Sequence, residues 1–256
     1  MTAEACADLV ERGDPDRWRS VMAAPVDRRA GLLALYAFNL EIARAPRVAS
    51  ESMLAEIRLR WWTDAVAEIF TGAPPRRHEV VAPLAEAVAG GDLPQALFDG
   101  MIAARLFDAE AASFEDMEAL RAYVEATSGN LVELAARHLG ASGPAIPVAR
   151  RFARGAGIAA LLRALPELAA LGHAPLPGGA DVAEIAAEGL ADILAARADR
   201  ATVPREAAAA LLPGWLADIR LRRAIADPKG VMAGSLDVSE FRARAVLLRR
   251  AVTGRW

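Results

Sequence analysis

Acidic side chains spaced one helical turn apart are the first candidates for chemistry in this 256-residue chain. Asp64 and Glu68 stand four residues apart, and Glu188 and Asp192 repeat the spacing. On a helix such residues share one face, and paired carboxylates can hold a hard cation such as Mg²⁺. The same pairs are common on the solvated face of an amphipathic helix, so both interpretations stay open.

Histidine and cysteine offer no recognisable reactive site. The three histidines lack the i, i+4 spacing of a zinc site, so we expect them at the surface or at helix ends; they are His78, His138 and His173. Cys6 is the only cysteine, which excludes an internal disulfide and a cysteine-based metal site and fits a reducing compartment.

Charge and hydropathy limit the classes of partner. The formal net charge of −3 argues against a nucleic acid partner. The first residues are acidic where a signal peptide would be basic, and no run approaches the ~18 apolar residues of a membrane span. We therefore expect a soluble, cytoplasmic protein, with a peripheral contact to the inner membrane left open.

Helix signals recur along the whole chain, whereas the alternation typical of strands is missing. Six places carry helix-start signals: Asp14-Pro15, Ser50, Asp92 with Pro94, Ser113-x-x-Asp116, Asp181-x-x-Glu184 and Asp237-x-x-Glu240. The stretch Pro175–Ala180 is typical of a loop. These patterns predict an all-α protein that forms one domain over residues 1–256.

The last predicted helix has an unusual distribution of apolar and basic residues. Phe241, Ala245, Leu248 and Val252 form one stripe, and four arginines surround it: Arg242, Arg244, Arg249 and Arg250. One interpretation is a helix whose stripe faces the core and whose basic face is solvated. The other is a surface that meets anionic lipid or an acidic partner.

Two stretches near the N-terminus resemble the squalene/phytoene synthase family. DRRAGLLALYAFNLEIARAPRV (27–48) carries an apolar helix with Tyr-Ala-Phe, and EIRLRWWTDAV (56–66) carries Arg-Leu-x-Trp-Trp. Tyr123, six residues before Gly129, continues the likeness. The family's segment RDxxxDxxxGRxYLP aligns without a gap on Arg163, Gly172, Leu176 and Pro177.

This resemblance covers at least Arg17 to Pro177 and implies the isoprenoid-synthase fold, a helix bundle around a central apolar cavity. Members of the family are implied to join two allylic diphosphates, with aspartates at i and i+4 on two facing helices holding Mg²⁺. The metal neutralises the diphosphate as it leaves.

The chain departs from the family at the aspartates themselves. The four positions carry Ala43, Arg47, Ala164 and Leu168. A methyl or isobutyl group cannot ligate Mg²⁺, and Arg47 would repel it. We therefore expect no metal site, no cofactor and no catalysis by the family's mechanism.

The residues left at the second motif resemble a metal-less branch of the family. Gly157-Ile158 followed by Arg163-Ala164-Leu165-Pro166 is similar to that branch, which includes the mitochondrial assembly factor for respiratory complex I. The likeness implies a protein that binds a partner or a lipid and aids assembly of a membrane complex. Two alternatives are a prenyltransferase with other catalytic acids, such as Asp64 with Glu68, and a carrier of an isoprenoid or quinone tail.

Arginines stand where the family implies acids. Arg163 is either an inherited residue that pairs with Glu167, or an anion contact together with arginines of the facing helix. The second interpretation predicts a ligand site at the mouth of the cavity, formed by Tyr36, Arg44, Arg47 and Arg163.

Overall fold

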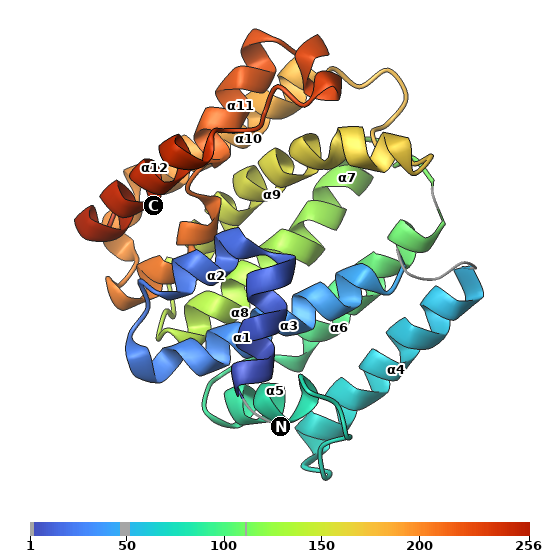
Figure 1. Cartoon of the computed structure of the whole chain (residues 1–256), viewed down its shortest axis with the longest axis vertical. Coiled ribbons are helices and arrows are strands. Elements are labelled where there is room, and N and C mark those ends of the chain that lie inside the picture. Colours follow the sequence, from blue (N-terminus) through green and yellow to red (C-terminus); the bar gives the residue numbers. More distant parts are fainter. Residues whose placement is uncertain (1–2, 47–51, 111) are drawn as a thin grey trace.

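The computed structural model describes residues 3–46, 52–110 and 112–256, and every regular element within them is a helix (Figure 1). The α-helices are α1 (Ala3–Gly13), α2 (Pro15–Val21), α3 (Arg29–Arg44), α4 (Ser52–Thr71), α5 (Val81–Ala89), α6 (Gln95–Ala109), α7 (Met117–Val124), α8 (Asn130–His138), α9 (Ala145–Ala170), α10 (Val182–Ala198), α11 (Ala217–Ala226) and α12 (Glu240–Thr253). Short 3₁₀ turns and one π-helical segment, Glu125–Gly129, complete the chain. The expected all-α fold is confirmed.

Aspartate caps begin three helices. Asp14 and Asp181 do so as the sequence predicts, and Asp116 caps α7 in place of the predicted Ser113. The side chains of Asp14, Asp116 and Asp181 each accept a hydrogen bond from a backbone N–H two or three residues later. These bonds satisfy amides that the first helical turn leaves free.

Two other predicted caps are wrong. Ser113 donates to a backbone carbonyl in the loop after α9 (2.5 Å), and Asp237 forms an ion pair with Arg163 (2.9 Å). Both side chains therefore have partners outside the helix they were expected to begin. Ser50 lies outside the described residues.

The long helix α9 contains Pro166 without ending there. Proline removes one backbone hydrogen bond, but the helix continues to Ala170. Gly172 then adopts a positive φ of 82°, and the amides of Gly172 and His173 donate to carbonyls in the last turn. The expected loop at Pro175–Ala180 follows.

Helix α9 forms the centre of the bundle, packed against α8, α10 and α11 (Figure 1). On the other side of the molecule, α3 packs against α1, α5 and α8, and α4 packs against α6. Aromatic rings fill much of the core: Phe38 meets Trp62 and Phe98 edge to face, with ring centroids 5.4 and 5.5 Å apart. These packed layers fix the positions of α3, α6 and α9 relative to one another.

The π segment joins α7 to α8 in one continuous helical rod. Its wider turn is a feature often found at functional sites. Within it, Thr127 donates its hydroxyl to the carbonyl of Tyr123 (2.7 Å), which ties the π segment to α7.

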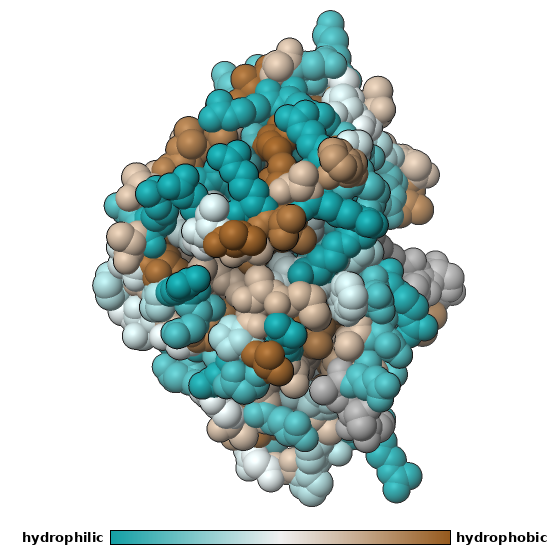
Figure 2. Space-filling view, turned by 60° about the vertical axis from the view of Figure 1, so that its left-hand side comes forward, coloured by the Kyte–Doolittle hydropathy of each residue, from teal (hydrophilic) through white to brown (hydrophobic). Residues whose placement is uncertain are grey.

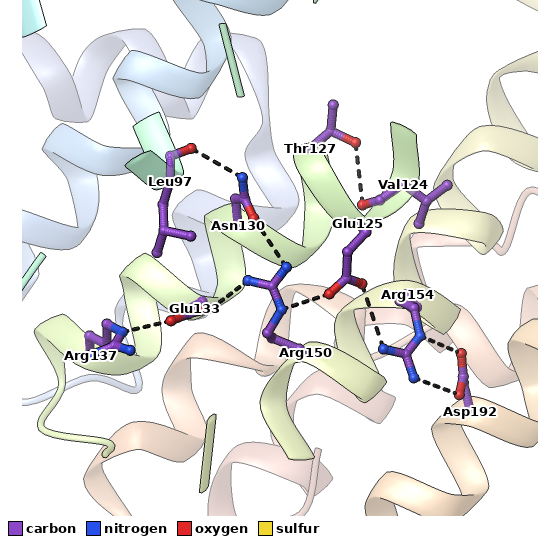
Figure 3. A network of polar contacts seen from close by, with 10 residues as sticks. All are labelled: Leu97, Val124, Glu125, Thr127, Asn130, Glu133, Arg137, Arg150, Arg154 and Asp192. Carbon is purple, nitrogen blue, oxygen red and sulfur yellow. Dashed lines mark hydrogen bonds and ion pairs between the residues drawn. The ribbon is translucent and has the colours of Figure 1, made fainter. Parts of the chain in front are cut away.

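A polar network connects this rod to α9 and α10 (Figure 3). Its charged members and one amide are Glu125, Asn130, Glu133, Arg137, Arg150, Arg154 and Asp192. Arg150 lies at the centre and bonds to Glu133, to Glu125 (2.6 Å) and to Asn130 (3.2 Å). The side chain of Glu133 is 8% exposed, so its pair with Arg150 is largely shielded from solvent, whereas Glu125 is partly exposed.

Helix α12 lies at the surface of the molecule (Figure 1), and its apolar stripe is exposed. Phe241, Leu248 and Val252 are 85%, 66% and 72% exposed. The core-facing interpretation is wrong, because the opposite face of the helix supplies the buried contacts through Ala243 and Leu247. None of the helices in the described ranges is long and apolar enough to cross a membrane.

Candidate functional site

A cavity of about 490 Å³ opens between α3, α6, the π segment and α9. Its lining includes Asn39 and Leu40 from α3, Phe107 from α6, Thr127 from the π segment and Leu161 from α9. A cavity of this size lies within the range that binds a small organic molecule. The expected central cavity is therefore present in the bundle.

Three of the four motif positions line this cavity together. Ala43 projects from α3, and Ala164 and Leu168 project from α9, four residues apart on one face. Arg47 lies outside the described residues. The three described side chains carry no oxygen, so they do not fit the Mg²⁺ that the resemblance implies.

The other paired acids are held by arginines. Arg76 forms two hydrogen bonds of 2.7 Å with Glu68 and approaches Asp64 at 3.9 Å. Neither acid lines the cavity. Within the described residues, no group of three or more histidine, cysteine or acidic side chains is placed to hold a metal ion.

In the second acid pair, each carboxylate forms an ion pair with a different arginine. Glu188 pairs with Arg121 (2.6 Å), and Asp192 pairs with Arg154 (3.0 Å). Both pairs link α10 to neighbouring helices. Their interpretation as solvated or structural charges therefore agrees with the geometry.

Arginines outnumber acids on the cavity wall. Arg17, Arg44 and Arg105 line it, and Asp108 is its one acidic side chain among the described residues. Arg17 pairs with Asp14 and Arg105 pairs with Asp108. No described carboxylate pairs with Arg44, whose guanidinium lies over Gly13 so closely that a Cβ there would meet it at 2.6 Å. A cavity with this lining suits an anionic group better than a cation.

Asp108 is itself engaged by its neighbours. Arg105 donates to Asp108 (3.0 Å) and to the hydroxyl of Tyr123 (2.7 Å), and that hydroxyl donates to Asp108 (2.8 Å). Burial alone would lower the pKa of Arg105, but Tyr123 and Asp108 outweigh it, and the pKa is raised. The cluster therefore holds an arginine that stays charged at the cavity wall.

Aromatic rings and a close helix contact shape the rest of this wall. Phe107 stacks on Phe114 with centroids 4.0 Å apart, and Tyr123 lies against Phe114 at 5.1 Å. On α9, a Cβ at Gly157 would meet Ser128 at 2.6 Å, so only glycine allows α9 to approach the π segment this closely.

The predicted ligand-binding residues do not all converge. Arg44 lines the cavity, whereas Tyr36 is buried in the core and is not part of the wall. Burial raises the pKa of the Tyr36 hydroxyl, and Arg17 lies over its ring at 5.7 Å. Arg47 lies outside the described residues.

Arg163 also points away from the cavity. It is half-exposed, pairs with Asp237 (2.9 Å) and lines a smaller neighbouring hollow that shares Ala160 and Ala164 with the cavity. The reason is helical geometry, since adjacent residues are rotated by about 100°, so Arg163 points to a different side of α9 from Ala164, which faces the cavity. The expected meeting of Arg163 with Arg44 at the cavity mouth is therefore not found.

Three cavity residues were missed as site candidates from the sequence: Arg17, Arg105 and Asp108. For the last two a signal existed, because opposite charges at i and i+3 on one helix can pair. Their meeting with Tyr123, 15 residues beyond Asp108, depends on the fold. The lining of the cavity by His173 is equally a result of tertiary structure.

Comparison with known proteins identifies a family and a set of relatives. A family model described as squalene/phytoene synthase matches residues 10–256. The human protein named NADH dehydrogenase (ubiquinone) complex I, assembly factor 6 is 27% identical over 167 residues, which are 64% of this chain and 50% of that protein. Its Drosophila melanogaster homolog is 29% identical over 174 residues, 64% of this chain and 51% of that protein. The chain spans about half the length of the curated relatives it matches.

Two solved structures share the fold. A dehydrosqualene synthase in complex with ligand has a TM-score of 0.82 at 15% identity, covering 98% of this chain and 95% of that one. Squalene synthase HpnC from Alicyclobacillus acidocaldarius has a TM-score of 0.73 at 17% identity, covering 87% and 92%. At these identities the likeness concerns the isoprenoid-synthase fold alone.

Proposed function

Because the chain belongs to the squalene/phytoene synthase family but carries no carboxylate at the motif positions, we propose that it works without catalysis. In this proposal it binds a partner protein during assembly of a respiratory, complex I-type membrane complex. The observation that carries it is the lining of the cavity by Ala43, Ala164 and Leu168. The relatives named complex I assembly factor 6 support the assembly role.

The cavity chemistry also disfavours a prenyltransferase with substitute acids. Ionisation of a diphosphate requires the leaving charge to be neutralised, and Mg²⁺ needs oxygen ligands to do this. Asp108 is the acid in the cavity lining that could offer such oxygens, but its carboxylate already accepts hydrogen bonds from Arg105 and Tyr123. Asp64 and Glu68, the acids considered from sequence, are held by Arg76 outside the cavity.

A turnover assay tests the non-catalytic part of the proposal. The purified chain is incubated with farnesyl or geranylgeranyl diphosphate and Mg²⁺ or Mn²⁺, beside a catalytic member of the family. We expect neither a condensed product nor released diphosphate. Turnover above a no-protein control would overturn the proposal and direct attention to Asp108.

The assembly role is tested in the cells that make the chain. Its removal should lower the amount of assembled NADH dehydrogenase complex on a native gel, and re-expression should restore it. An unchanged amount of assembled complex would contradict the role. Chemical crosslinking in the same cells should join the chain to a subunit or another assembly protein of that complex.

A second candidate function, carriage of an isoprenoid or quinone tail, follows from the cavity lining. Apolar side chains such as Leu161 and Leu168 could contact a tail, while Arg17 and Arg44 could contact an anionic head. A ligand that binds only the folded state stabilises it, by ~2.7 kcal/mol at a hundred times its Kd. Farnesyl diphosphate and a short-chain quinone, without metal, are the probes.

Matched variants on α9 make this measurement specific. Ala164→Trp fills the cavity and should abolish the rise in melting temperature caused by the probe. Ala169→Trp places the same ring at an exposed position outside the cavity and should leave the rise intact. Absence of a rise with the unmodified chain would reject the carrier function.

A further inference from the structure

Helix α12 has two apolar faces, and only one of them packs against the rest of the protein. On the inner face, Ala243 is buried against Trp215 and Leu216, and Leu247 packs on the main core. Arg250 forms an ion pair with Asp218 (2.8 Å) on α11. The helix is thus held firmly to the body without its outer residues.

The outer face carries a continuous apolar stripe that nothing in the described residues covers. We call Phe241, Ala245, Leu248 and Val252 the outer stripe. Their spacing of four, three and four residues places them on one line along the helix. Phe241 is 85% exposed, the largest exposed fraction among the large hydrophobic residues of the described chain. Figure 2, turned to bring this side forward, shows apolar side chains among hydrophilic ones.

Arginines border the outer stripe on both sides. At 100° per residue, Arg244 falls on one edge, and Arg242 and Arg249 fall on the other. Arg244 pairs with Glu240 on the surface (3.0 Å), an exposed pair that holds the charge only weakly. No described carboxylate pairs with Arg242 or Arg249, so both are available to an external anion.

From this arrangement we infer that α12 docks on the surface of an anionic lipid bilayer. The outer stripe enters the boundary between headgroups and acyl chains, and the three arginines bind the lipid phosphates. An exposed apolar stripe with cations along both edges matches the boundary between headgroups and acyl chains of an anionic bilayer. The inference does not depend on the assembly role.

Vesicle flotation tests the inference directly. The full chain is mixed with vesicles of phosphatidylcholine alone or of phosphatidylcholine with phosphatidylglycerol. We expect flotation with the anionic vesicles, little with the neutral ones, and a decline as salt rises, because salt screens the arginines. No flotation with anionic vesicles would overturn the inference, as would equal flotation with both kinds.

Paired variants separate the contributions of the stripe and the arginines. Phe241→Ser with Leu248→Ser removes apolar area and should weaken binding at least about tenfold. Arg242→Gln with Arg249→Gln should weaken it by roughly fivefold per arginine. Because all four side chains are exposed, these variants should fold normally. Val26→Ser and Arg12→Gln are matched exposed controls elsewhere and should leave binding unchanged.

A fluorescent label reports which face meets the bilayer. Cys6 is fully buried, and burial raises the pKa of its thiol to about 11, so it should resist labelling. A polarity-sensitive dye on Ala245→Cys should shift to the blue on anionic vesicles, whereas the same dye on Ala103→Cys of α6 should not. Equal shifts at both positions, or binding by the outer stripe to an acidic protein but not to vesicles, would overturn the inference.

Discussion

The two halves of α9 handle charge in opposite ways. In the first half, Arg150 and Arg154 extend into the polar network and each bonds to carboxylates on neighbouring elements. In the second half, Ala164 and Leu168 face the cavity where the family implies acids. The charges that hold helices together are therefore paired, and the acids that would hold a metal are replaced.

This contrast indicates that the scaffold and the chemistry of the fold can change separately. The network stabilises the packing of α8, α9 and α10 without any ligand. The cavity remains open, and Arg44 on its wall has no carboxylate partner among the described residues. Loss of the metal ligands therefore need not destabilise the bundle.

The largest effect is expected from removing Arg150, the central charge of the polar network in the first half of α9. Arg150→Ala leaves the buried Glu133 and the partly exposed Glu125 each with one fewer cation and should lower the free energy of unfolding by ~3 kcal/mol. Urea denaturation measures the loss. Arg151→Ala, next along the helix, removes an exposed pair with Asp199 (3.8 Å) and should cost less than ~0.5 kcal/mol. Equal losses would show that the network contributes no more than a surface pair.

A smaller effect is expected where α9 meets the π segment. In Gly157→Ala the new methyl would approach Ser128 at 2.6 Å and Val124 at 2.7 Å, so one element must shift. Overpacking should cost ~1–2 kcal/mol after the gain in helix propensity. Gly178→Ala, in a loop with open space around it, is the matched control. A neutral Gly157→Ala would mean that the close approach is not required.

Protonation of His138 provides a test of a buried group outside the network. Burial lowers its pKa, although its ring hydrogen-bonds the carbonyl of Arg28 (3.0 Å). Because the pKa of His138 is lower in the folded state, the unfolded chain binds more protons at this residue. Its contribution to stability is therefore complete above pH ~6.5, the ordinary histidine pKa, and is lost as the pH falls below that value. The loss should not exceed ~1.4 kcal/mol per pH unit.

Urea melts at pH 7 and at lower pH measure this dependence, with His138→Gln beside the unmodified chain. The variant should show a flatter pH profile between about 6.5 and 5. Carboxylates titrate mainly below this window, so identical profiles would assign the loss to other groups.

The surface pair at the second half of α9 should matter least among the charges. Arg163 and Asp237 are 51% and 69% exposed, so Arg163→Ala should change the free energy of unfolding by less than ~0.5 kcal/mol. A loss as large as that of Arg150→Ala would erase the distinction between the two halves.

Metal removal should have no measurable effect. Since Ala43, Ala164 and Leu168 offer no oxygen, EDTA should leave the melting temperature unchanged, and added Mg²⁺ should not enhance stabilisation by farnesyl diphosphate. A catalytic family member serves as the positive control. A metal-dependent shift in this chain would reveal ligands that the cavity lining does not suggest.

The helical fold follows from patterns that are local in the chain. Asp14 and Asp181 cap the helices they precede because a cap needs only neighbouring amides. Asp237 failed as a predicted cap because Arg163, 74 residues away, competes for its carboxylate. Local spacing cannot reveal such a partner.

Predictions for the candidate site also succeeded or failed according to whether they depended on the three-dimensional arrangement of the helices. Aligned motif residues correctly placed Ala43 near Ala164, since the family fold brings those positions together. Arg163 was placed wrongly because its direction depends on rotation around α9. The outward stripe of α12 was also undecidable from periodicity, which shows that a face is apolar but not which side the body covers.

The polar network has a consequence for the order in which the chain folds. Its three bonds to Arg150 span 17, 20 and 25 residues, and the bond from Arg154 to Asp192 spans 38. Short loops cost less entropy to close, so α8, α9 and α10 can assemble before the distant N-terminal helices dock. We expect their amide hydrogens to exchange with solvent together, in one slow cooperative unit.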